Sequence, residues 1–70
     1  MEFVIVVFPE PRQVILDGNA SGATGDLLQV QAGPHIFNLS DPQNYSPAQQ
    51  TLIVTNTTPE NPMEVTFAPN

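Results

Sequence analysis

The chain contains no cysteine, no lysine and no tryptophan, and each absence excludes a type of site. Without cysteine there is no disulfide, no thiolate zinc site and no cysteine nucleophile. The single cation, Arg12, stands against seven acidic residues, which gives a net charge of -6. Phosphate binding depends on several cations, so this composition argues against nucleic acid as a partner.

Long apolar segments are also lacking. The longest apolar run, Phe3 to Phe8, has six residues, whereas a membrane-spanning helix needs about 20, so we predict no membrane insertion. No basic region precedes this run and no small-residue cleavage motif follows it, which is not typical of a signal peptide. The location stays open: the cell surface or exterior if the chain is part of a larger exported protein, otherwise the cytoplasm or a virion.

Eight prolines and four glycines divide the 70 residues into short runs rich in valine, isoleucine, threonine and phenylalanine. Frequent breaks disfavour helices, and the composition of the runs favours strands. Most runs alternate apolar and polar residues, so one face of each strand is apolar. We predict strands at 2–8, 12–17, 26–31, 35–40, 49–55 and 62–68.

Closing these apolar faces on each other gives a two-layer fold with a single interior. The prediction is one all-β domain over residues 1–70, a small immunoglobulin-like or transthyretin-like β-sandwich of about six or seven short, mainly antiparallel strands.

The first run, FVIVVF, breaks the alternation because it is apolar on both faces. A two-layer sandwich has one interior, so the second face requires either cover from within the fold or contact with another chain or domain. We assign the outward face to Val4, Val6 and Phe8 and predict, with Tyr45, a candidate interaction surface for a protein partner.

The segment DGNASGATGDLL, from Asp17 to Leu28, begins like a calcium-binding loop. Its twelfth position should be a bidentate glutamate but is Leu28, and strands flank it where helices would be needed. The same residue types satisfy a turn between strands. We interpret the segment as a turn and predict no metal site or cofactor.

Two single residues invite functional interpretations. His35, the only histidine, starts a strand on the side of Phe37 and Leu39. No nucleophile or acidic partner stands at triad spacing, so we interpret His35 as a residue packed at the rim of the core. Tyr45 is interpreted as closing one end of the core with its hydroxyl bonded to nearby backbone, the alternative being a stacking platform for a carbohydrate.

The order of these strands and turns resembles that of a known family. VIVVFPEP is followed by QVILDG, the turn SGATGD, LLQV, AGPHIF, NYSP, TLIV and a closing MEVTF. Over nearly all 70 residues this order resembles the PEGA domain, a small β-sandwich module of bacterial and archaeal surface and multidomain proteins. The loop before Tyr45 is longer than the family's. The family has no catalytic residues to carry over, so the resemblance implies a binding or structural module.

The expected function is therefore a non-enzymatic interaction or structural module, an accessory domain of a larger surface or multidomain protein. The alternative is a self-assembling structural subunit, such as a virion decoration protein or a filament component. A carbohydrate-binding module is the third reading. The first strand is expected to contact the protein partner.

Overall fold

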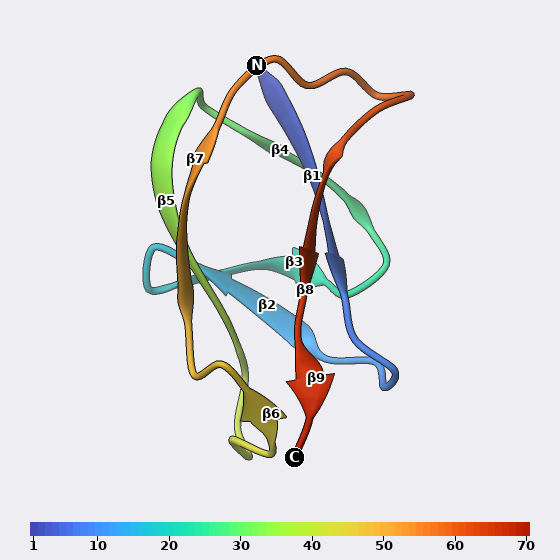
Figure 1. Cartoon of the computed structure of the whole chain (residues 1–70), viewed down its shortest axis with the longest axis vertical. Helices are drawn as coiled ribbons and strands as arrows, with labels where there is room; N and C mark the ends of the chain where they lie inside the picture. Colours follow the sequence, from blue (N-terminus) through green and yellow to red (C-terminus); the bar gives the residue numbers. More distant parts are fainter.

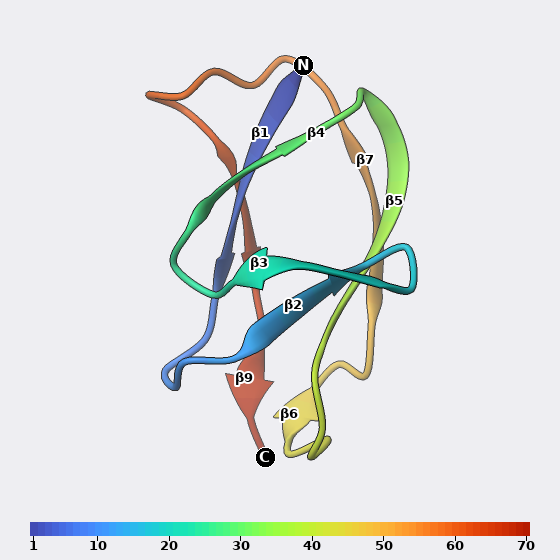
Figure 2. The same cartoon turned by 180° about the vertical axis from the view of Figure 1, so that it is seen from behind.

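The computed structural model describes all residues 1–70 and consists of strands without a helix (Figures 1 and 2). The strands are β1 (Glu2–Val7), β2 (Gln13–Leu16), β3 (Asn19–Ala23), β4 (Leu27–Val30), β5 (Gly33–Leu39), β6 (Tyr45–Ser46), β7 (Gln50–Val54), β8 (Met63–Thr66) and β9 (Ala68–Pro69). Each of the six predicted strands is present, with ends within two residues of the predicted ones.

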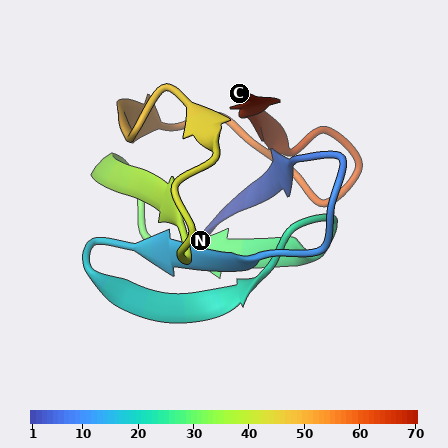
Figure 3. The ribbon, with the colours of Figure 1, turned by 90° about the horizontal axis from the view of Figure 1, so that it is seen from below.

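Two sheets form the layers of a sandwich. One has the order β4-β1-β8 and the other β3-β2-β5-β7, while β6 and β9 pair at one end. Every pairing is antiparallel except that of β1 with β8, which is parallel. Figure 3 looks along the long axis from the end where β6 and the C-terminus lie. The prediction of an all-β sandwich with mainly antiparallel strands is confirmed.

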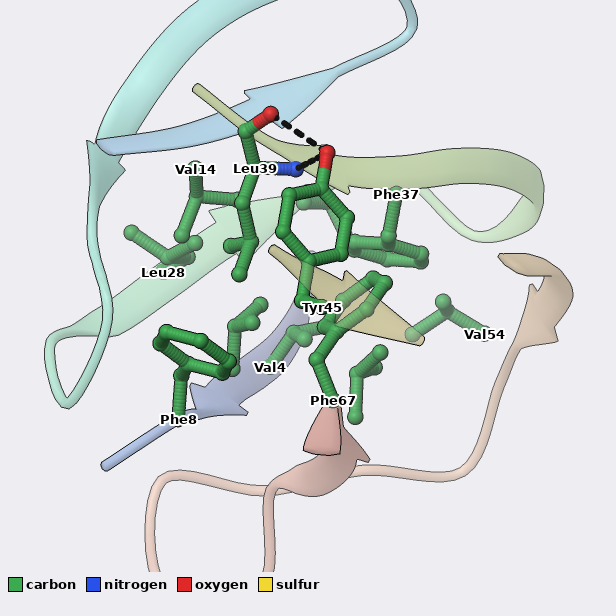
Figure 4. Close-up of a cluster of buried hydrophobic side chains, with 12 residues drawn as sticks. Val4, Phe8, Val14, Leu28, Phe37, Leu39, Tyr45, Val54 and Phe67 are labelled. Carbon is green, nitrogen blue, oxygen red and sulfur yellow. Dashed lines mark hydrogen bonds between the residues drawn. The ribbon is translucent and has the colours of Figure 1, made fainter. Parts of the chain in front are cut away.

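The core consists of twelve buried apolar side chains from both sheets and the end pair, several of them labelled in Figure 4. They are Val4, Val6, Phe8, Val14, Leu28, Val30, Phe37, Leu39, Tyr45, Val54, Val65 and Phe67. Leu16, Leu52 and Met63 pack against this cluster. The apolar faces predicted from the alternation are thus the ones that point inward.

The predicted outward face of β1 is wrong. Val4 and Val6 are fully buried, and Phe8 lies in the same cluster. The cross-strand partners explain this choice, because Val4 lies opposite Leu28 and Val6 opposite Val65, both core residues. β1 is the central strand of its sheet, so it offers no unpaired edge. Its other face points outward.

Three strands were not predicted. β6 and β9 have two residues each, too few for a periodic pattern. β3 lies within the segment interpreted as a turn and pairs with β2. Gly22 in β3 has φ +140° and lies so close to Leu28 that a Cβ would stand 2.6 Å from its side chain. Glycine therefore lets this edge strand approach the core closely.

Candidate interaction surface

An apolar patch occupies the outward side of the three-stranded sheet. It consists of Phe3, Ile5 and Val7 of β1 and Leu27 of β4, and we call it the outer face. Ile5 lies opposite Leu27 on one side and opposite Glu64 of β8 on the other. Val7 and Leu27 are 39% and 46% exposed, while Phe3 and Ile5 are half-buried between neighbouring strands. Clustered rather than isolated exposed apolar residues are typical of interaction sites.

Tyr45, predicted as part of an interaction surface, lies in the core instead. Its hydroxyl donates to Leu39 O (2.7 Å) and accepts from Leu39 N (3.2 Å), as the dashed lines in Figure 4 mark. Its ring packs edge-on against Phe8 and Phe67, with centroid distances of 6.1 and 5.4 Å. The reading of Tyr45 as closing one end of the core is confirmed. A buried ring offers no free face for stacking a sugar.

The chain's single cation is used inside the fold. The Arg12 guanidinium lies 5.2 Å from the centre of the Phe8 ring. Its bonds go to Ser40 O (3.2 Å), Pro42 O (2.8 Å) and Asn44 Oδ1 (2.8 Å), and it lies 3.6 Å from the Glu10 carboxylate. Arg12 thereby holds the loop before Tyr45 in place. Because the guanidinium is engaged, the surface presents no free basic side chain to a partner.

The segment that begins like a calcium loop forms a turn, a strand and a second turn. Asp17 and Gly18 both have positive φ, 51° and 85°, as a two-residue hairpin connection between β2 and β3 requires. Leu28, which stands at the position of the essential glutamate, is a core residue. No three acidic or histidine side chains of the chain form a group that could hold a metal ion.

His35 has an acidic partner that sequence spacing did not reveal. Its Nδ1 lies 2.7 Å from Asp17 Oδ2, and its Nε2 lies 2.6 Å from Gln31 O. The other Asp17 oxygen accepts a bond from Ile36 N (2.9 Å). Carbonyl and ionised carboxylate oxygens only accept, so both bonds of His35 are made at once when the ring is protonated. The His35 side chain is 14% exposed, which agrees with its predicted place at the rim of the core.

These bonds shift both pKa values. The hydrogen bond that His35 donates to Asp17, followed by the one that it donates to Gln31 O, raises the pKa of His35 above its ordinary value. The backbone N–H of Ile36, followed by the His35 ring, lowers the pKa of Asp17. With both nitrogens engaged and no hydroxyl or thiol among their partners, the pair links the β2–β3 turn to β5 and is no nucleophile-activating site.

We expect the stability of the domain to fall as the pH rises past neutrality. A raised folded-state pKa means that the His35 contribution is fully present below the ordinary value of 6.5 and is lost as the pH rises through the folded-state pKa. The Asp17 contribution has the opposite sign, because its lowered pKa makes it present above 3.8 and lost as the pH falls through the folded-state pKa. Between pH 3.8 and pH 6.5 both contributions are present, so the pair stabilises the fold most in this range.

Urea unfolding at about pH 5.5 and about pH 8.5 checks this expectation. The wild-type midpoint should be higher at the lower pH, and His35→Gln should remove most of the difference. An equal pH effect in both proteins would contradict the assignment to His35.

Two open hollows, of about 460 and 300 Å³, both border Pro11. The charged residues that line them are Arg12 and Asp26 in the first and Glu10 in the second. The cation of the first hollow, Arg12, is already bonded to Ser40 O, Pro42 O and Asn44 Oδ1. The structure also contains no helix with the length and hydrophobicity that a bilayer crossing requires.

Comparisons with family models, curated proteins and solved structures found no match to this chain. The structure itself defines the class: a small all-β sandwich domain with one apolar sheet face left open.

Proposed function

We propose that the chain is a non-enzymatic interaction module that binds another protein or a neighbouring domain through the outer face. The observation that carries this proposal is the grouping of Phe3, Ile5, Val7 and Leu27 on one side of the three-stranded sheet. Full burial of a side chain of this size contributes about 1.5–3 kcal/mol. These side chains are partly exposed, so a partner that covers them gains a part of that free energy for each side chain.

The resemblance to PEGA domains supports the same role. Members of that family are modules of larger surface and multidomain proteins, and binding or structural roles are supposed for them. The engagement of both His35 ring nitrogens supports the non-enzymatic part of the proposal. Carbohydrate binding loses its candidate residue because Tyr45 is buried.

The charge of the chain indicates which kind of protein surface fits the outer face. The net charge is -6, and the side chain of Arg12 is held by internal bonds. Glu64 flanks the apolar patch beside Ile5. Ionic contacts across this interface must therefore come from cations of the partner. The fitting partner is a protein surface with an aliphatic or aromatic centre and lysine or arginine at its rim.

Selection of peptides from a displayed random library against the wild-type domain tests this proposal. We expect enrichment of peptides that combine aromatic or aliphatic residues with lysine or arginine. Replacing Ile5 and Val7 together by threonine should keep the fold, because both side chains point outward, and should weaken peptide binding by about tenfold or more. Binding should also weaken as salt is added, because the ionic contacts are screened.

The matched control is Ile36→Thr. Ile36 is 40% exposed, close to the 39% of Val7, but it lies on the other sheet. This variant should bind the selected peptides as the wild type does. Peptides that bind the Ile5/Val7 variant with undiminished affinity would contradict the outer face as the binding surface.

A self-assembling structural subunit is the second candidate function. It is favoured by a separate observation, because β7 is the last strand of its sheet and pairs with β5 alone.

A further inference from the structure

The backbone of β7 has unpaired groups along one edge. β7 is the last strand of the four-stranded sheet and pairs with β5 alone. Ile36 lies opposite Thr51, but its N–H and C=O bond to Asp17, on the side of β5 away from β7. Pro34, opposite Ile53, has no N–H to donate. Pairs in an antiparallel ladder alternate, so the backbone groups of Thr51 and Ile53 face away from β5.

No hydrogen bond joins these backbone groups to the rest of the chain. Both residues are exposed, and Ile53, at 69%, is the most exposed large apolar residue after Met1. β7 thus presents two N–H and two C=O groups next to exposed β-branched side chains. An edge of this kind is a template for strand pairing.

The other edge strands carry features that discourage pairing. In β3 an extra residue, Ser21, interrupts the register with β2, and its hydroxyl donates to Asn19 O. β8 contains Glu64, and its Thr66 O already accepts a bond from Gln50. β4 has four residues and follows Asp26 directly. β7 contains no charge, no proline and no register shift.

We infer that two copies of this chain pair antiparallel through β7. With Leu52 opposite Leu52 of the second copy, Thr51 of each copy lies opposite Ile53 of the other. Each of these two pairs exchanges both N–H···O=C bonds, so all the unpaired backbone groups find partners. The pairing is isologous, and it joins the two four-stranded sheets into one.

Charge favours a second copy as the occupant of this edge. Residues 43 to 59 contain no charged side chain, so the edge meets no like charge when it meets itself. The rest of the chain carries the net charge of -6, which opposes close approach at low salt. Added salt should therefore strengthen the dimer. This is the reverse of the salt dependence expected for a cationic partner on the outer face, so the two proposals stand or fall separately.

Amide hydrogen exchange of the full chain, measured from micromolar to millimolar concentration together with sedimentation equilibrium, tests the inference. The Leu52 amide, paired with β5, should be protected at every concentration. The Thr51 and Ile53 amides should exchange freely in the monomer and become protected as the dimer forms. A chain that stays monomeric at millimolar concentration, or a dimer in which these two amides remain unprotected, would overturn the inference.

Ile53→Pro removes an edge N–H without removing a bond inside the chain, and it should abolish the dimer while the monomer stays folded. If the proline distorts β7, Thr51→Lys gives an independent answer. It keeps the backbone donor but sets a lysine of each copy on the edge, so two like charges meet there when the edges pair and the dimer should be lost. Ile36→Thr, on β5 and therefore one strand in from the edge, should dimerise normally. If both edge variants still form the dimer, or if Ile36→Thr does not form it, pairing through β7 is overturned.

Discussion

Replacing Val4 and Val6 together by threonine is expected to remove about half of the stability of the domain. Both side chains are fully buried in the core, and their neighbours there are apolar. Threonine has nearly the shape of valine, so the effect comes from burying two hydroxyls without partners, at about 1–3 kcal/mol each. A chain of this size has about 4–10 kcal/mol of stability in total. A loss of about 2–6 kcal/mol is about half of that total.

The same exchange on the opposite face of the same strand is the control. Ile5→Thr with Val7→Thr replaces two outward-pointing residues by threonine, whose β propensity is similar to theirs. The fold should therefore persist with a small loss of stability. Far-ultraviolet circular dichroism and urea unfolding of both double variants measure the difference. Similar losses in the two variants would mean that the burial of the two faces of β1 does not differ as described.

Which face of β1 lies inside could not be predicted from alternation. Each face carries three apolar residues, and a shift of one residue in register exchanges them. The choice depends on partners distant in sequence: Leu28 of β4, Val65 of β8 and the Tyr45 ring against Phe8. In the other predicted strands one face was mostly polar, so alternation alone identified the buried side.

The remaining differences have physical causes of the same kind. β3 is formed by small residues that are typical of turns, and it became a strand because β2 supplied a ladder beside it. The contact between His35 and Asp17 depends on the register of β2 with β5, which brings the hairpin turn beside the start of β5. The alternation of the ladder determines which backbone groups of β7 are unpaired. The phase of that alternation is known only when the strands on both sides of β5 are known.

The two proposed surfaces lie on different sheets and respond oppositely to salt. The outer face belongs to the three-stranded sheet and is flanked by Glu64, whereas the β7 edge belongs to the four-stranded sheet and is uncharged. A domain could therefore form a dimer through one sheet and leave the other free for a partner. The dimer would then present two outer faces, which raises avidity for a partner with repeated sites.

Tyr45→Ala is expected to destabilise the domain more than any other single change considered. The ring lies in the core between Phe8 and Phe67, and its removal leaves a cavity that costs about 3–5 kcal/mol. The hydroxyl has a second role. β7 begins opposite Phe37 and so does not reach Leu39. The N–H and C=O of Leu39 therefore have no strand to pair with on the β7 side of β5. The Tyr45 hydroxyl bonds both groups in place of the missing strand.

Tyr45→Phe separates these two contributions because it keeps the ring and removes the hydroxyl. We expect a loss of about 1–3 kcal/mol, since the Leu39 groups remain buried without partners. Urea unfolding of the wild type and the two variants gives both values. If Tyr45 served to bind a ligand and its hydroxyl faced solvent, phenylalanine would leave the stability unchanged. A marked loss in Tyr45→Phe, with a larger one in Tyr45→Ala, is the result that the bonds to Leu39 require.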